Sequence, residues 1–272
     1  MRIFAASLAL CAWVASVCNA QRIVTLAPAL TELVYAAGAG DKLVAISAWS
    51  NYPPEATKLP VVADHAAVNR EALLALKPDV VLAWKTGTPE KSMASLRALG
   101  VEVRVLDGQR IDDVPRLLRE IGQIANTPRP AEQAAKAYES RLANIRRRFA
   151  SLRPVPALIE VWHSPLMTVS GGHYMSDALV ACGGRNVLAD LPGITPEVSL
   201  ERIVDIDPDA IIGAGSADGS ARFKDNWKRF ANLKAVKRDT LIWLDPDTFQ
   251  RQTPRLLNGV ETLCAALDAA RR

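Results

Sequence analysis

The stretch AEQAAKAYESRLANIRRRFAS, residues 131–151, decides how the chain is organised. It consists almost entirely of good helix formers and contains neither glycine nor proline. Pro154 and Pro156 follow it closely, and proline does not continue a helix. At about 1.5 Å per residue, such a helix is about 30 Å long, enough to connect two lobes. The sequence therefore predicts one long helix, residues 129–153, between two folded units.

Both flanking segments alternate short apolar runs, rich in β-branched residues, with helix-forming segments. The expected strands cover residues 22–26, 43–47, 79–84 and 101–106 before the long helix, and 157–162, 209–212 and 240–244 after it. Runs that are apolar on both faces and separated by helices indicate parallel sheets. We therefore expect an α/β fold of two Rossmann-like lobes with parallel sheets, residues 21–128 and 154–272, joined by a single long α-helix.

Residues 1–20 differ from the rest of the chain. A positive start at Arg2 precedes an uncharged stretch over residues 3–17, and Cys18-Asn19-Ala20 ends it with small residues where a signal peptidase acts. This pattern predicts a secretory signal peptide that is cleaved after Ala20. The alternative is a buried N-terminal helix or a membrane anchor, but the apolar run is short for a membrane span.

Two cysteines, Cys182 and Cys264, remain once the signal peptide is removed. In an oxidising compartment two such cysteines most often pair. We therefore expect a disulfide between them, with two buried free thiols as the alternative.

Composition and motifs exclude several classes of function. About half of the 272 residues are hydrophobic and the formal net charge is +4, so the chain is neither disordered nor strongly basic. The histidines are few, namely His65, His163 and His173, and no catalytic or metal-binding spacing is present. The glycines between 213 and 219 are spaced too widely for a dinucleotide loop. We expect no enzyme activity, no cofactor, no metal site and no nucleic-acid partner.

Large aromatic residues lie at the expected strand ends. Trp49 and Tyr52 follow the strand 43–47, Trp84 ends the next apolar run, and Trp162 ends the first strand of the second lobe. In open parallel sheets a ligand binds outside the carboxyl ends of the strands. Flat aromatic surface there favours a large, planar, partly apolar ligand. Core packing is the alternative role for each of these side chains.

The two halves of the chain share one short pattern. Glu71 precedes Pro78-Asp79 and an apolar run, and Glu201 precedes Pro208-Asp209 and an apolar run at the same spacing. The two glutamates are therefore expected to begin equivalent helices in the two lobes. An acid in the first turn of a helix also complements the helix dipole, which explains either one alone. Together they predict a docking surface for a partner with two-fold symmetry.

Four segments show a resemblance to a known family. They are Ser50-Asn51-Tyr52-Pro53-Pro54, the run from Leu76 to Trp84, Cys182-Gly183-Gly184-Arg185-Asn186-Val187, and the segment from Asp247 to Arg255. These resemble the periplasmic substrate-binding proteins of ABC importers that have a helical backbone, and among them the vitamin B12-binding proteins of the BtuF type. The resemblance covers residues 22–267, nearly the whole chain beyond the expected signal peptide.

The resemblance implies a periplasmic, monomeric binding protein that holds cobalamin (vitamin B12) or a related corrinoid between its lobes and delivers it unchanged to the permease and ATPase complex of an ABC importer. It implies that Trp49 contacts the ligand and that Glu71 and Glu201 dock on the permease. It also implies a Cys182–Cys264 disulfide. The segment implied to contact the ligand consists of Asp247, Thr248, Phe249, Gln250 and Arg251.

One position departs from the family and leaves alternatives open. His65 stands where the best-known members carry a tryptophan, and an imidazole stacks less well but is able to ligate cobalt or haem iron. Haem or an iron siderophore is the alternative ligand within the class, with Arg251 and Arg255 available for an anionic complex. A periplasmic enzyme on the same scaffold, using His65 or His163, is the alternative from another class.

Overall fold

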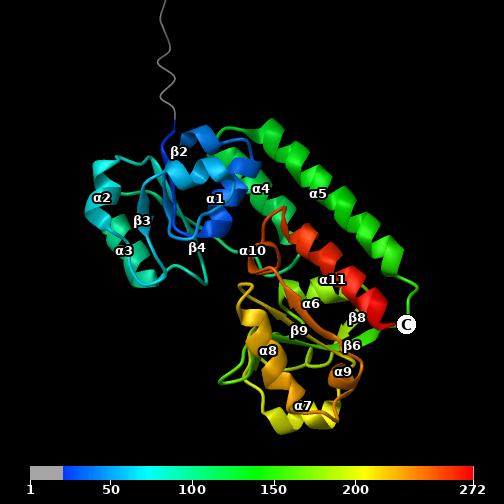
Figure 1. The fold of residues 1–272 in the computed structure, drawn as a ribbon. Helices are drawn as coiled ribbons and strands as arrows, with labels where there is room; N and C mark the ends of the chain where they lie inside the picture. Colours follow the sequence, from blue (N-terminus) through cyan, green and yellow to red (C-terminus); the bar gives the residue numbers. More distant parts are fainter. Residues whose placement is uncertain (1–20, 272) are drawn as a thin grey trace, which may run out of the picture.

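The computed structural model describes residues 21–271, so the expected signal peptide lies outside the described residues. The described chain forms two α/β lobes with a long helix along one side (Figure 1). The prediction of an α/β fold with two lobes and a connecting helix is confirmed. Within the described residues, no helix is long and apolar enough to cross a membrane.

The N-terminal lobe contains a five-stranded sheet in the order β3-β2-β1-β4-β5, and all its neighbouring strands are parallel. The strands are β1 (Ile23–Thr25), β2 (Leu43–Ser47), β3 (Val61–Ala63), β4 (Val80–Trp84) and β5 (Val103–Leu106). The strand order reverses between β1 and β4, and this is the point where open parallel sheets bind ligands. The short edge strand β3 was not expected from the sequence.

Helices cover both faces of this sheet. They are α1 (Pro28–Ala36), α2 (Arg70–Ala75), α3 (Glu90–Ala98) and α4 (Asp113–Ile124), with 3₁₀ turns η1 (Gly40–Lys42) and η2 (Pro54–Lys58). Leu73 of α2 and Leu96 of α3 are buried against one face. Leu30 of α1 and Leu117 of α4 are buried against the other. A sheet covered on both faces explains why its strands are apolar throughout.

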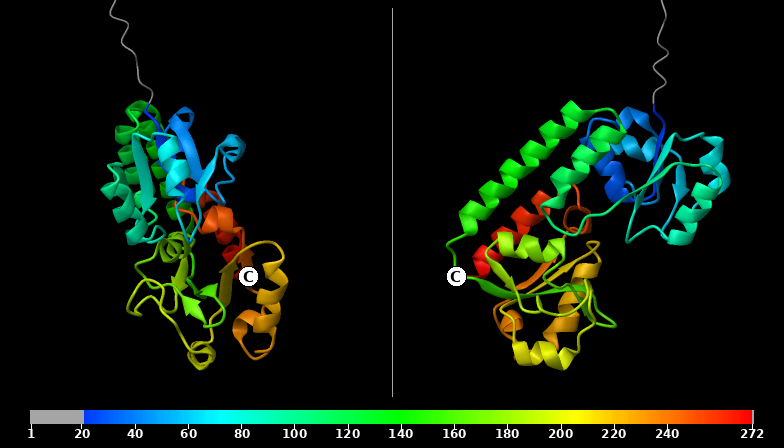
Figure 2. Two further views of the ribbon diagram at one scale, coloured as in Figure 1. Left: turned by 90° about the vertical axis from the view of Figure 1, so that its left-hand side faces the viewer. Right: turned by 180° about the vertical axis from the view of Figure 1, so that it is seen from behind.

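The long helix α5 (Pro128–Phe149) is amphipathic. Its buried side chains recur every three or four residues: Ala131, Ala135, Tyr138, Leu142, Ile145 and Phe149. The helix packs against α4 with its N-terminal part and against α11 (Leu256–Ala270) with its C-terminal part, along one edge of the molecule (Figure 2). The Tyr138 hydroxyl donates a hydrogen bond to the Ile111 carbonyl at 3.0 Å, and burial raises the pKa of Tyr138.

The C-terminal lobe contains a second sheet with the path β10-β9-β6-β7, to which β8 adds by pairing with β6. Its strands are β6 (Val155–Trp162), β7 (Met167–Thr168), β8 (Gly184–Asn186), β9 (Ala210–Ala214) and β10 (Leu241–Leu244). The short β7 runs antiparallel to β6, because the chain turns back on itself within a few residues. This pair is an exception to the expected parallel arrangement.

The remaining helices belong to the C-terminal part: α6 (Tyr174–Ala181), α7 (Leu200–Ile206), α8 (Gly219–Lys228), α9 (Lys234–Lys237) and α10 (Pro246–Phe249), besides α11. Ile203, Phe223 and Trp227 cover one face of the sheet. Helices α6 and α11 cover the other face and are linked by the Cys182–Cys264 disulfide. The predicted disulfide is therefore confirmed.

One continuous apolar core crosses both lobes. It runs from Ile23 and Leu30 through Leu117 of α4 and Leu142 of α5 to Leu263 of α11. Separating the lobes widely would expose this core at a cost of about 25 cal/mol for each Å² of apolar surface. The connection between the lobes is therefore a packed layer of helices, among them α4, α5 and α11, and this layer resists large hinge motion.

Candidate ligand-binding cleft

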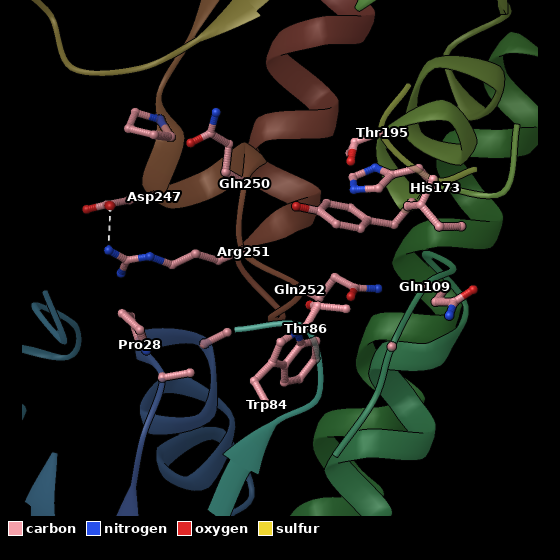
Figure 3. Close-up of a pocket in the computed structure, with 16 residues that line it drawn as sticks. Pro28, Trp84, Thr86, Gln109, His173, Thr195, Asp247, Gln250, Arg251 and Gln252 are labelled. Carbon is pink, nitrogen blue, oxygen red and sulfur yellow. Dashed lines mark ion pairs between the residues drawn. The ribbon is translucent and has the colours of Figure 1, made fainter. Parts of the chain in front are cut away.

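A cleft lies between the lobes, at the carboxyl ends of strands from both sheets. It contains a cavity of about 550 Å³, a volume typical of small-molecule sites. Figure 3 shows the walls of this cavity. The labelled lining residues are Pro28, Trp84, Thr86 and Gln109 from the N-terminal lobe, and His173, Thr195, Asp247, Gln250, Arg251 and Gln252 from the C-terminal part.

Part of the N-terminal wall is apolar, formed by Pro28 and Trp84. Pro28 is the first residue of α1, a position that proline favours, and it follows β1 after two residues. Trp84 is the last residue of β4 and packs partly against the core. The Trp84 backbone N–H donates to the Thr88 hydroxyl at 3.1 Å, which orders the turn behind the indole. The cavity therefore has a flat aromatic surface at the end of a central strand.

Arg251 is the only cation among the residues that line this cavity, and its charge is already compensated. Its guanidinium lies 2.9 Å from the Glu32 carboxylate and 2.7 Å from that of Asp247. It also donates to the Asn51 side-chain oxygen at 2.7 Å and to the Trp49 carbonyl at 3.1 Å. The network leaves no free positive charge at this point of the cleft.

The same network reaches deeper through Glu32, which is on α1 and 3% exposed. The Glu32 carboxylate accepts hydrogen bonds from the Thr253 hydroxyl at 2.9 Å and from Arg255 at 3.2 Å. The Arg255 guanidinium in turn lies over the Tyr52 ring, 4.0 Å from its centroid. Glu32 and Asp247 balance the two arginines, so the cluster is neutral as a whole.

The opposite wall contains His173 and Tyr174, which the sequence did not single out as site residues. His173 is the N-cap of α6, and its Nδ1 accepts a hydrogen bond from the Met175 backbone N–H at 3.2 Å. Burial lowers the pKa of His173 to about 4, so the imidazole is neutral near pH 7. A histidine placed as an N-cap gave no recognisable signal, because Ser, Thr, Asp and Asn are the usual caps.

A second hollow of about 580 Å³ lies beside the first and shares Gln250 with it. It is lined by Trp162 at the end of β6 and by Trp243 of β10. The Trp162 indole N–H donates to the Ser164 carbonyl at 2.9 Å, which orients an indole that is 62% exposed. Below it, the buried Glu160 accepts a hydrogen bond from Trp227 at 2.5 Å. Burial raises the pKa of Glu160.

The other two predicted aromatic residues, Trp49 and Tyr52, do not line either hollow. Trp49 follows β2, is 78% exposed, and has a backbone φ of 66°, a conformation that non-glycine residues rarely adopt. Trp49 is not among the residues that line the cavity, although its carbonyl accepts a hydrogen bond from Arg251, which does line it. Tyr52 stacks under Arg255 and is partly exposed.

Two residues of the predicted ligand-contacting segment do not line either hollow. Phe249 is 1% exposed, because its side chain fills the core shared by the two lobes. The Thr248 hydroxyl donates to the side chain of Asp245 at 3.2 Å, where both residues belong to the start of α10. Asp247, Gln250 and Arg251 do line the cavity, because one helical turn places them on its side.

His65 lies outside both hollows. It is exposed in the turn between β3 and α2, beside Asp64, whose pKa is lowered by hydrogen bonds from backbone N–H groups. Among residues 21–271, no group of three or more His, Cys, Asp or Glu side chains is arranged to hold a metal ion. The structure does not bring His65 to the lining of either hollow, and its contact with a ligand stays a prediction.

Glu71 and Glu201 occupy equivalent positions, as the shared pattern predicts. Each is in the first turn of a helix that leads into a central strand, Glu71 in α2 after the N-cap Asn69, and Glu201 in α7 after the N-cap Ser199. Both side chains are exposed. Helices α2 and α7 lie in different lobes, far apart in the molecule (Figure 1).

Two α/β lobes that enclose a cleft and share a helical backbone define the substrate-binding protein class. Residues 23–248 match the family described as periplasmic binding protein, and the chain belongs to this family. Among its relatives is the vitamin B12-binding protein of Vibrio cholerae, 36% identical over 253 residues, a match that covers 93% of this chain and 91% of the relative. The vitamin B12-binding protein of Pectobacterium carotovorum is 37% identical over 92% of this chain and 89% of its own length.

Solved structures show the same fold. The crystal structure of the periplasmic vitamin B12-binding protein BtuF of Vibrio cholerae matches with a TM-score of 0.83 and 35% identity, covering 93% of this chain and 98% of that one. A periplasmic haem-binding protein from Pseudomonas aeruginosa matches with a TM-score of 0.78 and 26% identity, covering 90% and 92%. The fold is therefore shared by proteins named for different planar, metal-containing ligands.

Proposed function

We propose that this protein captures cobalamin or a related corrinoid in the cleft between its lobes and delivers it to an ABC importer. The family and the similarity to vitamin B12-binding relatives over nearly the whole chain support this proposal. The ligand is released unchanged, so the protein acts as a binding protein and needs no cofactor. It acts as a monomer in the periplasm, after cleavage of a signal peptide behind Ala20.

The observation that carries the choice of ligand is the charge balance of the cleft. Arg251 is paired with Glu32 and Asp247, and His173 is neutral near pH 7. Haem presents propionate carboxylates and ferric siderophores are commonly anionic, so either ligand would require an unpaired cation. A corrinoid instead presents amide groups around its ring, and neutral polar groups suffice to bind them. The cavity at Arg251 therefore favours the corrinoid.

The aromatic surfaces support the same choice. Trp84 lines the cavity and Trp162 lines the adjoining hollow, and the Trp49 carbonyl accepts a hydrogen bond from Arg251 of the cavity lining. Indole rings bury a large, rigid, partly apolar ligand at a low entropic cost. Together with Tyr52, Asp247, Gln250 and Arg251, they form the ligand-binding set that we propose; roles for His65, Thr248 and Phe249 require a rearrangement on binding.

Calorimetric titration of the mature protein tests the proposal. Cyanocobalamin and cobinamide are titrated beside haemin under identical conditions. We expect one site for a corrinoid and weaker or undetectable binding of haemin. Tight binding of haemin without binding of a corrinoid would show that haem, and not a corrinoid, is the ligand. Chemical conversion of the bound compound would instead indicate an enzyme on this scaffold.

Delivery to the importer is proposed to use Glu71 and Glu201. They are exposed, equivalent in position and located in different lobes, so a permease with two-fold symmetry would contact each of them in the same way. Exposed ion pairs contribute little energy individually, but they accelerate association and determine its orientation.

A further inference from the structure

His173 has one ring nitrogen committed to the protein and one turned to the cleft. Nδ1 accepts the Met175 backbone N–H at 3.2 Å, which satisfies one of the N–H groups left unpaired at the start of α6. The imidazole packs against the Tyr174 ring with the centroids 4.3 Å apart, and this holds its orientation. Figure 3 shows the ring of His173 directed into the cavity, beside Thr195.

The tautomer follows from this arrangement. A neutral imidazole carries one hydrogen, and a nitrogen that accepts a hydrogen bond is the one without it. The hydrogen is therefore on Nε2. Among residues 21–271, no hydrogen-bond partner is found for His173 Nε2 or for the hydroxyl of Tyr174, which is 8% exposed and also lines the cavity. Two polar groups on this wall thus lack a partner within the described chain.

We propose that His173 determines specificity in the cleft by donating its Nε2–H to an oxygen or nitrogen acceptor of the ligand, and that it does not bind the metal of the ligand. This inference rests on the proposed function and names the chemistry of one wall of the same site. The acceptor class is a neutral carbonyl, such as the peripheral amides of a corrinoid, and the Tyr174 hydroxyl offers a second donor beside it.

Metal binding through Nε2 would require the opposite tautomer. A histidine that binds a metal through Nε2 carries its hydrogen on Nδ1, where it usually donates to an oxygen. In this structure Nδ1 faces the Met175 N–H, so the opposite tautomer would place two donors against each other at the start of α6. The helix cap therefore selects a hydrogen-bond donor over an axial ligand.

Two substitutions of His173 distinguish its role as the helix N-cap from its role as a hydrogen-bond donor to the ligand. Asparagine is a good N-cap but is too short to present an amide N–H at the position of Nε2, so His173→Asn keeps the cap and removes the donor. Glutamine reaches farther, so His173→Gln keeps a donor and loses the preferred cap. Val180→Ala, on an exposed position of the same helix outside the cavity lining, is the matched control.

The experiment uses aquacobinamide, whose cobalt carries exchangeable water and no attached base. Calorimetry gives the affinity, and the visible spectrum reports nitrogen ligation of cobalt, which shifts the corrinoid bands. We expect the spectra of aquacobinamide bound to wild type and to His173→Asn to be the same. We also expect His173→Asn to weaken binding about tenfold, with the melting temperature retained, and His173→Gln to restore binding while melting earlier.

The outcomes are distinguishable from a failure of the proposed function. A spectral shift in the wild type that His173→Asn abolishes would show axial ligation and overturn the inference. Unchanged affinity in His173→Asn would also overturn it, by removing His173 from the ligand contacts. In both cases the wild type still binds a corrinoid, whereas a wild type that binds neither cyanocobalamin nor cobinamide contradicts the proposed function itself.

Discussion

The Arg251 guanidinium lies 2.9 Å from the carboxylate of Glu32, although 219 residues separate them in the chain. Glu32 belongs to α1 of the N-terminal lobe, and Arg251 follows α10 in the C-terminal part. The pair therefore connects the two lobes at the wall of the cavity. It also affects the charge that a ligand meets there, because Glu32 and Asp247 together balance Arg251, the one cation that lines the cavity, and its neighbour Arg255.

Replacing Glu32 with glutamine should change both stability and selectivity. Removing one partner of a buried ion pair leaves an uncompensated charge, so we expect the free energy of unfolding to fall by about 3 kcal/mol. The cluster of Arg251, Arg255 and Asp247 would then carry one uncompensated positive charge, which should raise the affinity for haemin and lower that for cobalamin. Urea unfolding and parallel titrations measure the two effects, with Glu55→Gln, an exposed acid of η2, as the control. An unchanged ratio of the two affinities would contradict the charge argument.

Trp49→Ala tests whether Trp49 contacts the ligand. Burial of one aromatic face against a ligand contributes about 1–3 kcal/mol, so cobalamin affinity should fall by roughly tenfold to a hundredfold. Trp49 is 78% exposed, so stability should be retained. Leu99→Ala, which removes another exposed apolar side chain from the same lobe, should leave the affinity unchanged. Equal affinities for the two variants would exclude Trp49 from the site.

The double substitution Glu71→Ala and Glu201→Ala should impair complex formation with the cognate importer and leave cobalamin affinity nearly intact. The physical reason is that both side chains are exposed in first turns, away from the cavity. Pull-down in nanodiscs measures assembly. Glu90→Ala is the matched control, since Glu90 is also an exposed first-turn acid but has no counterpart in the shared pattern. Full assembly of the double variant would contradict the docking role and leave only stabilisation of the helix dipole for both glutamates.

Removal of the disulfide should lower stability without altering the cleft. The bond closes a separation of 82 residues between α6 and α11, so the chain-entropy model predicts a loss of about 4 kcal/mol in the double variant Cys182→Ala and Cys264→Ala. Denaturant unfolding measures this loss. Intact mass after alkylation of the unreduced wild type serves as the check, because two labelled thiols would show that the native protein does not form the bond.

The lowered pKa of His173 predicts that the free energy of unfolding decreases at acidic pH. Its pKa is about 4 in the folded protein against 6.5 for the free side chain, so the unfolded state binds more protons between these values. Stability should therefore fall as the pH decreases from about 6.5 to about 4, with His173 contributing up to about 3 kcal/mol. His173→Asn should lack this contribution. Urea unfolding over that range measures the difference, and identical pH profiles would mean that His173 is not buried as a neutral group.

The local pattern of the sequence predicted most secondary structure. The run Leu43–Ser47 forms β2 over the residues expected, and the long helix expected over residues 129–153 is α5, which covers Pro128–Phe149. The equivalent first-turn positions of Glu71 and Glu201 followed from a repeated spacing, and their docking role stays a prediction. These local features were predictable because periodicity, capping and spacing are properties of neighbouring residues. The disulfide followed instead from counting cysteines. The edge strand β3 and the antiparallel β7 were not predicted, because two or three residues are too few to show a hydrophobic period.

The sequence by itself determined two α/β lobes, a long helix between them, the disulfide and the class of binding protein that its segments resemble. Only the tertiary structure decided which side chains face the ligand. It brought Glu32 to Arg251, turned Phe249 into the core, and placed His173 in the cleft with one nitrogen committed to a helix cap. These outcomes depend on packing between segments more than a hundred residues apart, and no local pattern encodes which face of a helical turn will meet the other lobe.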